Sequence, residues 1–391
     1  MRDWPLATLG DVFEIARGGS PRPIDSYITD DPSGINWIMI SDASQGSKYI
    51  SKTKKRIRPE GAQRSRRVQP GDFLLTNSMS FGRPYIMRAS GCIHDGWLVL
   101  SPRRNNVDAD FFYYLLGSKT VYAEFERRAA GLTVKNLNID SVKGVTVPIP
   151  PLLEQRRIAT VLDHADALRA KRRAALAQLD TLTQAIFLDM FGDPATILEK
   201  WPKRKLGDLL DFLTSGSRGW AEHYANDGDL FLRIQNVKRD ELSLDDIAYV
   251  KAPNSAEAAR TRVQPGDVLL SITADLGRTA VVPASLGPAF INQHLSILRT
   301  KAVVPRFLSA YLTSPVGQRQ VSGRNRHGVK AGLNFDDIRS LIVPLPPLTL
   351  QLKFQRRVAA VETLKGTHRA SATELEALFT SLQHRAFRGE L

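Results

Sequence analysis

Cysteine is almost absent from this chain, since Cys92 is the only one among 391 residues. A single cysteine excludes an internal disulfide and a zinc site built on cysteine ligands. The seven histidines are scattered without the spacing of metal ligands, so we expect no metal site. Long apolar runs are missing as well: none approaches the ~20 residues needed to cross a bilayer, and the opening MRDWPLATLG carries charge. We therefore expect a cytoplasmic protein.

Acidic residues are too few to balance the basic ones. The chain has 54 Lys and Arg against 40 Asp and Glu, which gives a formal net charge of +14. Such a surplus repels itself unless a polyanion neutralises it, and nucleic acid is the first candidate. From net charge alone, the alternative to nucleic-acid binding is a surface that is simply basic and well solvated. Clustering of the positive charges argues against this alternative.

Sequence motifs for catalysis are missing. We find no G-x-x-x-x-G-K-[ST] phosphate loop, no glycine-rich cofactor turn after a strand, no [DN]-P-P-[YF] motif and no nuclease-like cluster of carboxylates and lysine. His94 and His294 lie in matching strands at non-equivalent positions, which favours structural histidines over acid–base catalysts. We expect neither catalytic nor cofactor-binding residues here. Binding of S-adenosylmethionine by the isolated chain would instead indicate a self-contained nicking or methylating enzyme.

A long segment, from Pro148 to Pro194, recurs in degraded form from Pro344 to Leu391. Without a gap, PIPPLLEQ of the first copy meets PLPPLTLQ of the second. Proline has a fixed φ and no amide hydrogen, so P-x-P-P cannot be helix interior and acts as a rigid lead-in to the helix that follows.

Apolar residues then recur at spacings of three and four, interrupted at Arg172 in the first copy and at His368 in the second. This pattern is typical of a helix that packs against another long helix. Ordinary core packing would explain this seam in one helix alone, whereas two copies at a fixed interval favour a pair of helices. The seam residues are Ile158, Val161, Ala165, Leu168, Ala175, Leu179, Leu182 and Ile186 in the first copy, and Phe354, Val361, Leu364, Leu375, Leu378 and Leu382 in the second.

The globular segments repeat too. WPLATLGDVFEIARGGSPR returns as WPKRKLGDLLDFLTSGSRG, VQPGDFLLT as VQPGDVLLS, and NLNID as GLNFD. We predict an α+β protein with a pseudo-twofold internal repeat: two similar α/β domains separated by two long antiparallel coiled-coil helices. The expected boundaries are 1–150 for the first globular domain, 151–195 for the central helix, 196–346 for the second globular domain and 347–391 for the C-terminal helix.

The most basic segment lies in the first half, between Lys48 and Arg67, where nine positive groups accompany Glu60 alone. A solvated face usually mixes signs, so this run predicts contacts with backbone phosphates. Arg17 and Arg22 flank a Gly-Gly-Ser-Pro loop, which suits either an approach to nucleic acid or a plain surface turn. The candidates of the first domain are Arg17, Arg22, Lys48, Lys52, Lys54, Lys55, Arg56, Arg58, Arg64, Arg66, Arg67, Asn77, Ser78, Arg83 and Lys135.

The second half has lost this basic run and gathers cations instead in VSGRNRHGVKAG. Clustered lysines suit phosphates, whereas Arg, Asn and Gln in glycine-bounded loops suit base edges. The candidates of the second domain are Arg218, Gln235, Asn236, Arg278, Arg324, Arg326, His327 and Lys330.

The order domain, P-x-P-P helix, domain, P-x-P-P helix, with L-G-D, Q-P-G-D and L-N-[IF]-D in each half, resembles the specificity (S) subunit of type I restriction–modification systems. The resemblance spans essentially the whole chain. It implies that each domain reads one part of a split DNA target, and that the helices fix the spacing and dock two methyltransferase subunits. It also implies that S-adenosylmethionine and ATP bind partner subunits, including restriction subunits where the system has them.

The chain departs from the family pattern at the start of the second helix, which reads PPLTLQLKF where the first helix has PPLLEQRR. This departure would make the two contacts with methyltransferase subunits less alike. A duplicated RNA-binding or scaffolding module is the alternative function. RNA readers stack bases on exposed aromatics, whereas Phe111, Phe112, Tyr113 and Tyr114 lie on a helical segment suited to a core.

Overall fold

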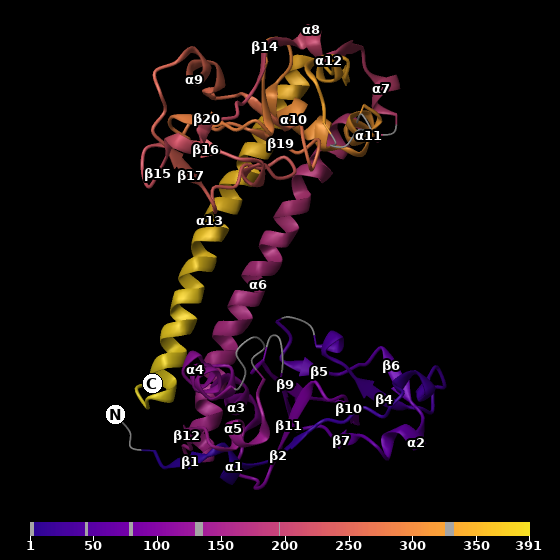
Figure 1. Ribbon diagram of the computed structural model, residues 1–391, viewed down its shortest axis with the longest axis vertical. Helices are drawn as coiled ribbons and strands as arrows, with labels where there is room; N and C mark the ends of the chain where they lie inside the picture. The colour runs from indigo at the N-terminus through magenta and orange to yellow at the C-terminus, as the bar shows by residue number, and fades with distance from the viewer. Residues whose placement is uncertain (1–3, 44–45, 78–80, 130–135, 195, 325–331) are drawn as a thin grey trace. The chain divides into compact units, whose positions relative to one another are not determined.

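The computed structural model describes residues 4–43, 46–77, 81–129, 136–194, 196–324 and 332–391 (Figure 1). Two compact units make up the chain: Met1–Arg173 with Ala370–Leu391, and Ala174–Arg369. Two helices of 40 residues each, α6 (Leu152–Phe191) and α13 (Leu348–Phe387), contribute one half to each unit. None of the helices in the described ranges is both long and apolar enough to cross a membrane.

The first unit contains three sheets. Two of them have five strands each, in the orders β2-β11-β8-β9-β5 and β3-β6-β4-β10-β7, and the third pairs β1 with β12. The strands are β1 (Leu6–Thr8), β2 (Phe13–Arg17), β3 (Ile28–Thr29), β4 (Ile35–Ile38), β5 (Tyr49–Ile50), β6 (Lys55–Ile57), β7 (Arg66–Val68), β8 (Phe73–Thr76), β9 (Pro84–Met87), β10 (Gly91–Ile93), β11 (Trp97–Pro102) and β12 (Thr146–Pro148). Its helices besides the long pair are α1 (Leu9–Val12), α2 (Pro59–Ala62), α3 (Ala109–Leu116), α4 (Lys119–Arg128) and α5 (Ile139–Lys143), with short 3-10 helices η1 (Ile24–Ser26) and η2 (Ile40–Asp42).

The second unit repeats this topology with the orders β14-β21-β18-β19, β15-β17-β16-β20 and β13-β22. Its strands are β13 (Lys203–Lys205), β14 (Leu210–Ser215), β15 (Tyr224–Ala225), β16 (Asp229–Leu232), β17 (Ala248–Val250), β18 (Val268–Ser271), β19 (Thr279–Val281), β20 (Ala289–Ile291), β21 (Leu295–Thr300) and β22 (Ile342–Pro344). Its helices are α7 (Ile197–Lys200), α8 (Leu206–Leu209), α9 (Ala256–Thr261), α10 (Pro305–Thr313), α11 (Pro315–Gly323) and α12 (Phe335–Arg339), with η3 (Trp220–His223) and η4 (Ile234–Asn236). The predicted α+β class and internal repeat are confirmed, and the first unit adds the edge strands β5 and β7.

The shared turn motif V-Q-P-G-D folds alike in both units. Gly71 has a φ of 96° and Gly266 a φ of 87°, the left-handed region that the third position of a type II turn requires. The amide of Asp72 closes the first turn by donating to the carbonyl of Gln69 at 3.1 Å. The Asp72 carboxylate in turn accepts from the amide of Gln69 at 2.8 Å, which further fixes the turn.

A buried glutamine anchors the start of each long helix. Gln155 Nε2 donates to the carbonyl oxygens of Pro150, at 2.9 Å, and Asn106, at 3.0 Å, while its Oε1 accepts from the amide of Asp108 at 2.8 Å. Gln351 makes equivalent hydrogen bonds at the start of α13, where its Nε2 donates to the carbonyl of Pro346 and its Oε1 accepts from the amide of Val304. The P-x-P-P-L-x-x-Q motif therefore satisfies backbone groups at the helix start and ties the helix to its own domain.

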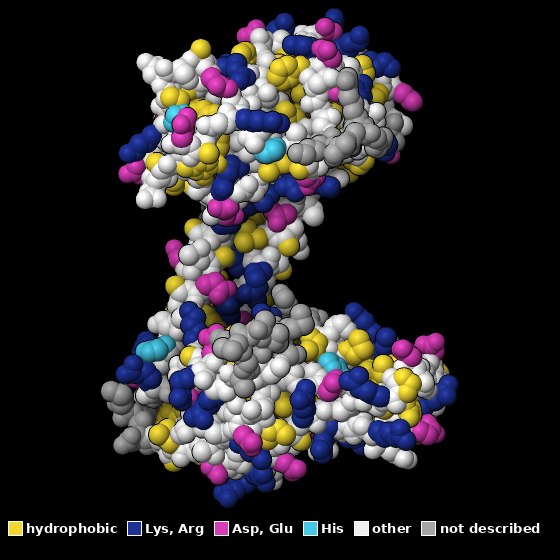
Figure 2. Space-filling view, in the orientation of Figure 1, with side chains coloured by type: hydrophobic (Ala, Val, Ile, Leu, Met, Phe, Trp, Pro, Cys, Tyr) yellow, Lys and Arg dark blue, Asp and Glu magenta, His cyan; other side chains and the backbone are white. Residues whose placement is uncertain are grey.

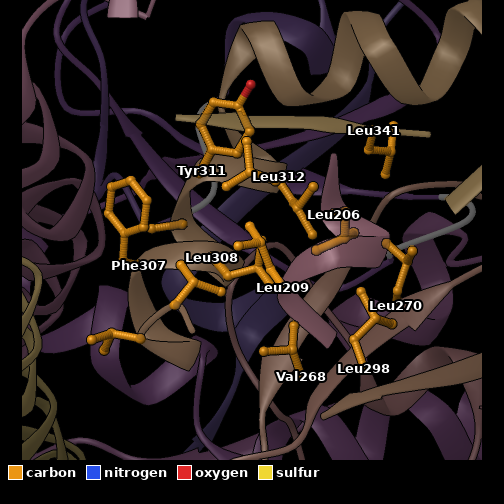
Figure 3. Packing of buried hydrophobic residues seen from close by; sticks show 14 of the residues in the cluster. Leu206, Leu209, Val268, Leu270, Leu298, Phe307, Leu308, Tyr311, Leu312 and Leu341 are labelled. Atoms are coloured by element: carbon orange, nitrogen blue, oxygen red, sulfur yellow. The ribbon is translucent and has the colours of Figure 1, made fainter. Parts of the chain in front are cut away.

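Each unit has its main core where its helices cover a sheet. In the first unit Phe111 and Phe112 of α3 are fully buried against the β2-β11-β8 sheet, as predicted for this aromatic segment. In the second unit α10 brings Phe307 and Tyr311 over the α8 segment and the β18–β21 strands (Figure 3). Phe354 of α13 packs against the same core, so the long helix is part of the domain's hydrophobic interior.

The long helices pair antiparallel within each unit (Figure 1). In the first unit Arg169 of α6 binds Glu376 of α13 at 2.6 Å. In the second unit Asp180 of α6 lies 3.1 Å from Lys365 of α13. Further along, at Asp189, the α13 partner is Arg357, also at 3.1 Å. The α13 number falls as the α6 number rises, which confirms the predicted antiparallel helices.

The predicted apolar seam is only partly correct. Ile158, Ala165, Leu179, Phe354 and Val361 are buried as predicted. Ion pairs occupy part of the contact face between the helices; the ammonium of Lys365, for example, is buried beside Asp180. In addition, a helix with 3.6 residues per turn drifts away from a seam that repeats every 3.5 residues. Four seam leucines are consequently 38% to 52% exposed, namely Leu168, Leu182, Leu364 and Leu378.

Candidate nucleic-acid interface

The loop after β2 depends on one glycine for its path. A Cβ at Gly18 would lie 2.0 Å from the carbonyl oxygen of His94, so the backbone can cross the turn between β10 and β11 only without a side chain. Gly216 has the same relation to Asn292 in the second unit, at 2.1 Å. These glycines place the loops that carry Arg22 and Arg218 beside the corresponding turns.

Three candidates of the first domain converge on Asp95. Arg17 Nε and Asn77 Nδ2 donate to its backbone oxygen, at 3.1 and 2.7 Å. The carboxylate accepts from the hydroxyl of Ser20 at 2.9 Å and lies 3.6 Å from Arg22 Nη2. The hydrogen bond from Ser20 lowers the pKa of Asp95, so the acid stays ionised. Asn77 is buried and supports the turn, whereas the Arg22 side chain is 82% exposed.

The basic segment divides over its sheet. β6 and β7 are separated by β4 and β10, so the cations of this segment do not form one continuous row. Arg56 is half-buried and donates to the carbonyl of Pro32 at 2.6 Å, and Arg64 donates to the hydroxyl of Tyr27 at 3.1 Å. The exposed cations of the segment are Lys52, Lys54, Lys55, Arg58, Arg64, Arg66 and Arg67.

Lys48 faces the long helix instead of solvent. Its ammonium lies 2.6 Å from Asp110 and 2.7 Å from Asp163 of α6, and the side chain is 14% exposed. Burial by itself would lower the pKa of Lys48, but the hydrogen bonds to the two carboxylates raise it above its usual value. This candidate holds its domain against α6, which is a structural role that nearby sequence does not reveal.

Gln235 and Asn236 of the second domain are engaged in their own loop. Asn236 is buried, and its Nδ2 donates to the carbonyl oxygens of Ser243 and Asp246, both at 3.0 Å. Gln235 Nε2 donates to the carboxylate of Asp246 at 3.1 Å. Asn236 therefore shapes the loop, while the half-buried Gln235 lies nearer its surface.

The arginine candidates of the second domain differ in exposure. Arg218 is exposed in the loop after β14. Arg278 Nε binds the carboxylate of Asp275 at 2.7 Å. Arg324 uses its guanidinium within the protein, donating to the hydroxyl and the carbonyl of Ser340 at 2.6 and 2.9 Å. In the first domain Arg83 is exposed next to β9. Outside the described residues lie Ser78, Lys135, Arg326, His327 and Lys330.

Arg260 is a cation beside the candidate loop that our sequence reasoning missed. From α9 its guanidinium donates to the carbonyl of Ser215 at 2.6 Å and to the hydroxyl of Ser217 at 3.0 Å, next to Arg218. A signal existed, because the aligned V-Q-P-G-D turns place Arg260 opposite Ser65 in the basic segment of the first half.

Lys and Arg side chains are spread over the visible face of each unit, with Asp and Glu between them (Figure 2). Within the described ranges, no group of three His, Cys, Asp or Glu side chains is placed to hold a metal ion. What these surfaces offer is many separate cations on loops and strand edges, an arrangement suited to phosphates and base edges.

Comparison with known proteins agrees with this geometry. The type I restriction enzyme EcoBI specificity subunit of Escherichia coli is 23% identical over 425 residues, covering 99% of this chain and 86% of that protein. The EcoKI specificity subunit of Escherichia coli strain K12 is 24% identical, with 99% and 89% covered.

Solved structures share the fold. A chain from work on complex assembly and conformational transition of the type I R-M system superposes with a TM-score of 0.62 at 20% identity, covering 99% of this chain and 98% of that one. The type I restriction-modification S subunit from M. genitalium gives 0.56 at 16% identity, with 98% and 96% covered. The family model described as type I restriction modification DNA specificity domain matches residues 1–178 and again 198–376. Because these two matches fall on the two repeated halves and cover most of its length, the chain belongs to the type I restriction modification DNA specificity domain family.

Proposed function

We propose that this chain is the non-catalytic DNA-binding subunit of a type I restriction–modification complex and that each domain reads one half of a bipartite target. The observation that carries this proposal is the duplication itself. The two units share strand order, turns and helix anchors, yet differ in the side chains on their loops, as in the pair Ile24 and Trp220 or Ser65 and Arg260. One scaffold with two different surfaces suits two different half-sites.

The proposed recognition domains are residues 1–150 and 196–346. Exposed lysines of the basic segment contact phosphates, which give affinity, and the arginines of the loops after β2 and β14 approach base edges, which give specificity. The proposed contact set is drawn from the exposed or partly exposed candidates, with Arg260 added: Arg17, Arg22, Lys52, Lys54, Lys55, Arg58, Arg64, Arg66, Arg67 and Arg83 in the first domain, and Arg218, Gln235, Arg260 and Arg278 in the second.

The long helices (151–195 and 347–391) set the distance between half-sites and dock two methyltransferase subunits. The exposed leucines support docking because they form repeat-related pairs: Leu168 corresponds to Leu364, and Leu182 to Leu378. The antiparallel ion pairs place Leu168 level with Leu378 in one unit and Leu182 level with Leu364 in the other. Each unit thus presents a similar pair of apolar side chains, as two copies of one partner require.

In this proposal S-adenosylmethionine and ATP bind partner subunits, and restriction subunits join the complex where the system encodes them. The complex acts on DNA in the cytoplasm. A duplicated RNA-binding module is the competing function, and structured RNA that displaced duplex DNA from the chain would favour it.

A domain exchange tests the proposal. Residues 1–150 are replaced by the corresponding domain of another family member, and methylated bases are mapped in DNA from cells carrying either chain. We expect the exchange to change one half of the modified sequence and to leave the other half and the spacer unchanged. A change in both halves, or in neither, contradicts independent reading by the two domains.

A further inference from the structure

The first domain contains an open hollow of about 940 Å³ beside the loop that carries Arg22. Half-buried apolar side chains line it, namely Ile24 of η1, Ile28 of β3 and Met39, together with the buried Trp37. A volume of this order lies within the range of protein sites for small organic groups. The hollow is therefore large enough for a nucleoside-sized group.

The second domain fills the equivalent space with its own side chain. η1 begins at Ile24 and η3 at Trp220, and each begins four residues before the next strand of its unit. Trp220 is 6% exposed and packs against Phe231, with ring centroids 5.1 Å apart. The strand register makes Trp37 of β4 the counterpart of Phe231 of β16. Ile24 packs against the small core around Trp37, as Trp220 packs against the core around Phe231. The hollow thus lies where the first domain has isoleucine and the second domain has tryptophan.

The mouth of the hollow is polar and carries a small excess of positive charge. Arg22, Lys55 and Asp25 line it, and all three are exposed. His94 also lines it and accepts a hydrogen bond from the amide of Gly96 through Nδ1 at 2.9 Å. Burial lowers the pKa of His94, so a neutral ring faces the hollow. An apolar interior whose mouth carries two cations against one carboxylate complements a flat, uncharged group attached to a phosphate.

We propose that this hollow takes an unstacked nucleobase of the DNA strand bound by the first domain. The inference rests on the proposed DNA-binding function and extends it with a second way of reading the target. Its interior contacts the faces of the base, with the polarizable sulfur of Met39 suited to an aromatic ring. Arg22 and Lys55 hold the flanking phosphates. The second domain, with Trp220 in place, reads its half-site without this step.

The Ile24→Trp substitution is the sharpest test, because it copies into the first domain the side chain that the second domain already accommodates. The full chain is titrated with a fluorescent duplex that is fully paired and with the same duplex carrying one bulged uracil. An unpaired base is easier to extrude, so wild type should bind the bulged duplex at least about fivefold tighter. Ile24→Trp should abolish this preference while keeping the affinity for the paired duplex.

Ile24→Val is the matched control, since it leaves the hollow open and should keep the preference. A second readout uses wild type alone and does not depend on a variant folding. With 5-iodouracil as the bulged base, ultraviolet crosslinks should map to Met39 or His94. Crosslinks only at other places, or an equal preference in Ile24→Trp and wild type, overturn the proposal.

The same assay distinguishes a base of DNA from a free nucleotide as the occupant of the hollow. It also distinguishes failure of the hollow proposal from failure of the proposed DNA-binding function. If free deoxynucleoside monophosphates bind in a manner sensitive to Ile24→Trp while the bulge confers no preference, the hollow serves a small molecule and the DNA assignment is wrong. If the chain binds paired duplex but shows no dependence on the bulge, only the hollow proposal fails. If it binds neither duplex, the proposed function itself fails.

Discussion

Lys48 and Lys54 lie in the same basic segment but in different electrostatic surroundings. The Lys48 ammonium is enclosed by Asp110 and Asp163, under three tyrosine rings at 4.8 to 5.7 Å. The Lys54 side chain is exposed, and its backbone amide donates to the carboxylate of Asp42 at 3.1 Å. One lysine therefore stabilises the fold, whereas the charge of the other is available to a polyanion.

Substituting these two lysines should separate stability from DNA binding. Lys48→Met leaves two carboxylates without their cation, so the free energy of unfolding should fall by about 2 to 3 kcal/mol in denaturant titrations. Lys54→Ala should leave stability unchanged, weaken binding to all duplex sequences and reduce the salt dependence of binding by about one unit of slope. An unchanged salt slope for Lys54→Ala would show that its segment does not contact phosphates.

The difference between Lys48 and Lys54 shows what the sequence can and cannot predict about a single residue. Composition and clustering indicate a polyanion partner, and that expectation applies to the segment as a whole. Whether one cation is free depends on acceptors from other elements of the fold, such as the carboxylate of Asp163 for Lys48 and the hydroxyl of Ser340 for Arg324. A linear pattern carries no information on such contacts.

At the scale of elements, the turn and cap motifs were the most predictable parts of the fold. Asn138 caps α5 by accepting from the amide of Ser141 at 2.7 Å, and asparagine is a residue type favoured at the start of a helix. The long-helix seam was less predictable, since Leu168 and Leu364 follow the heptad pattern and yet are exposed. Local chemistry decides a cap within one turn, whereas the burial of a seam position depends on what the rest of the protein packs against it.

Gln155 and Gln351 offer a test of how an element is held to its domain. Gln155→Ala removes three hydrogen bonds and leaves buried backbone groups without them, so it should lower the free energy of unfolding by about 2 kcal/mol. Amide hydrogen exchange should accelerate at the start of α6 but not at the start of α13. Gln351→Ala is the matched variant and should give the reverse pattern. Equal acceleration at both helix starts would contradict local anchoring.

At the scale of the whole molecule, the duplication explains why the fold was easier to predict than the site. Turn motifs that occur twice in one order identify a repeated scaffold, and the matched strand orders agree with it. The candidate site lies where the sequences of the two halves differ, and the repeated motifs predict nothing about the structure there. The edge strands β5 and β7 correspond only to isolated bridges in the second unit, Arg239–Thr279 and Arg262–Phe290, and the hollow lies beside Ile24, where the second unit has Trp220.

The length of the helix pair should set the spacer of the DNA target. The test inserts one heptad, copied from the helix itself, into both helices at facing levels: after Arg173 in α6 and after Ala372 in α13. Seven residues add about 10.5 Å and nearly preserve helical phase. With about 34 Å per turn of DNA, the spacer between methylated half-sites should grow by about three base pairs, both half-sites staying the same.

Insertion into α6 alone is the control for this experiment, because it breaks the register of the ion pairs that join Asp180 to Lys365 and Asp189 to Arg357. It should abolish modification instead of shifting the spacer. Sequencing of methylated DNA from cells carrying each variant measures both outcomes. An unchanged spacer in the double insertion would mean that contacts between partner subunits, and not the paired helices, determine the distance at which the two domains read DNA.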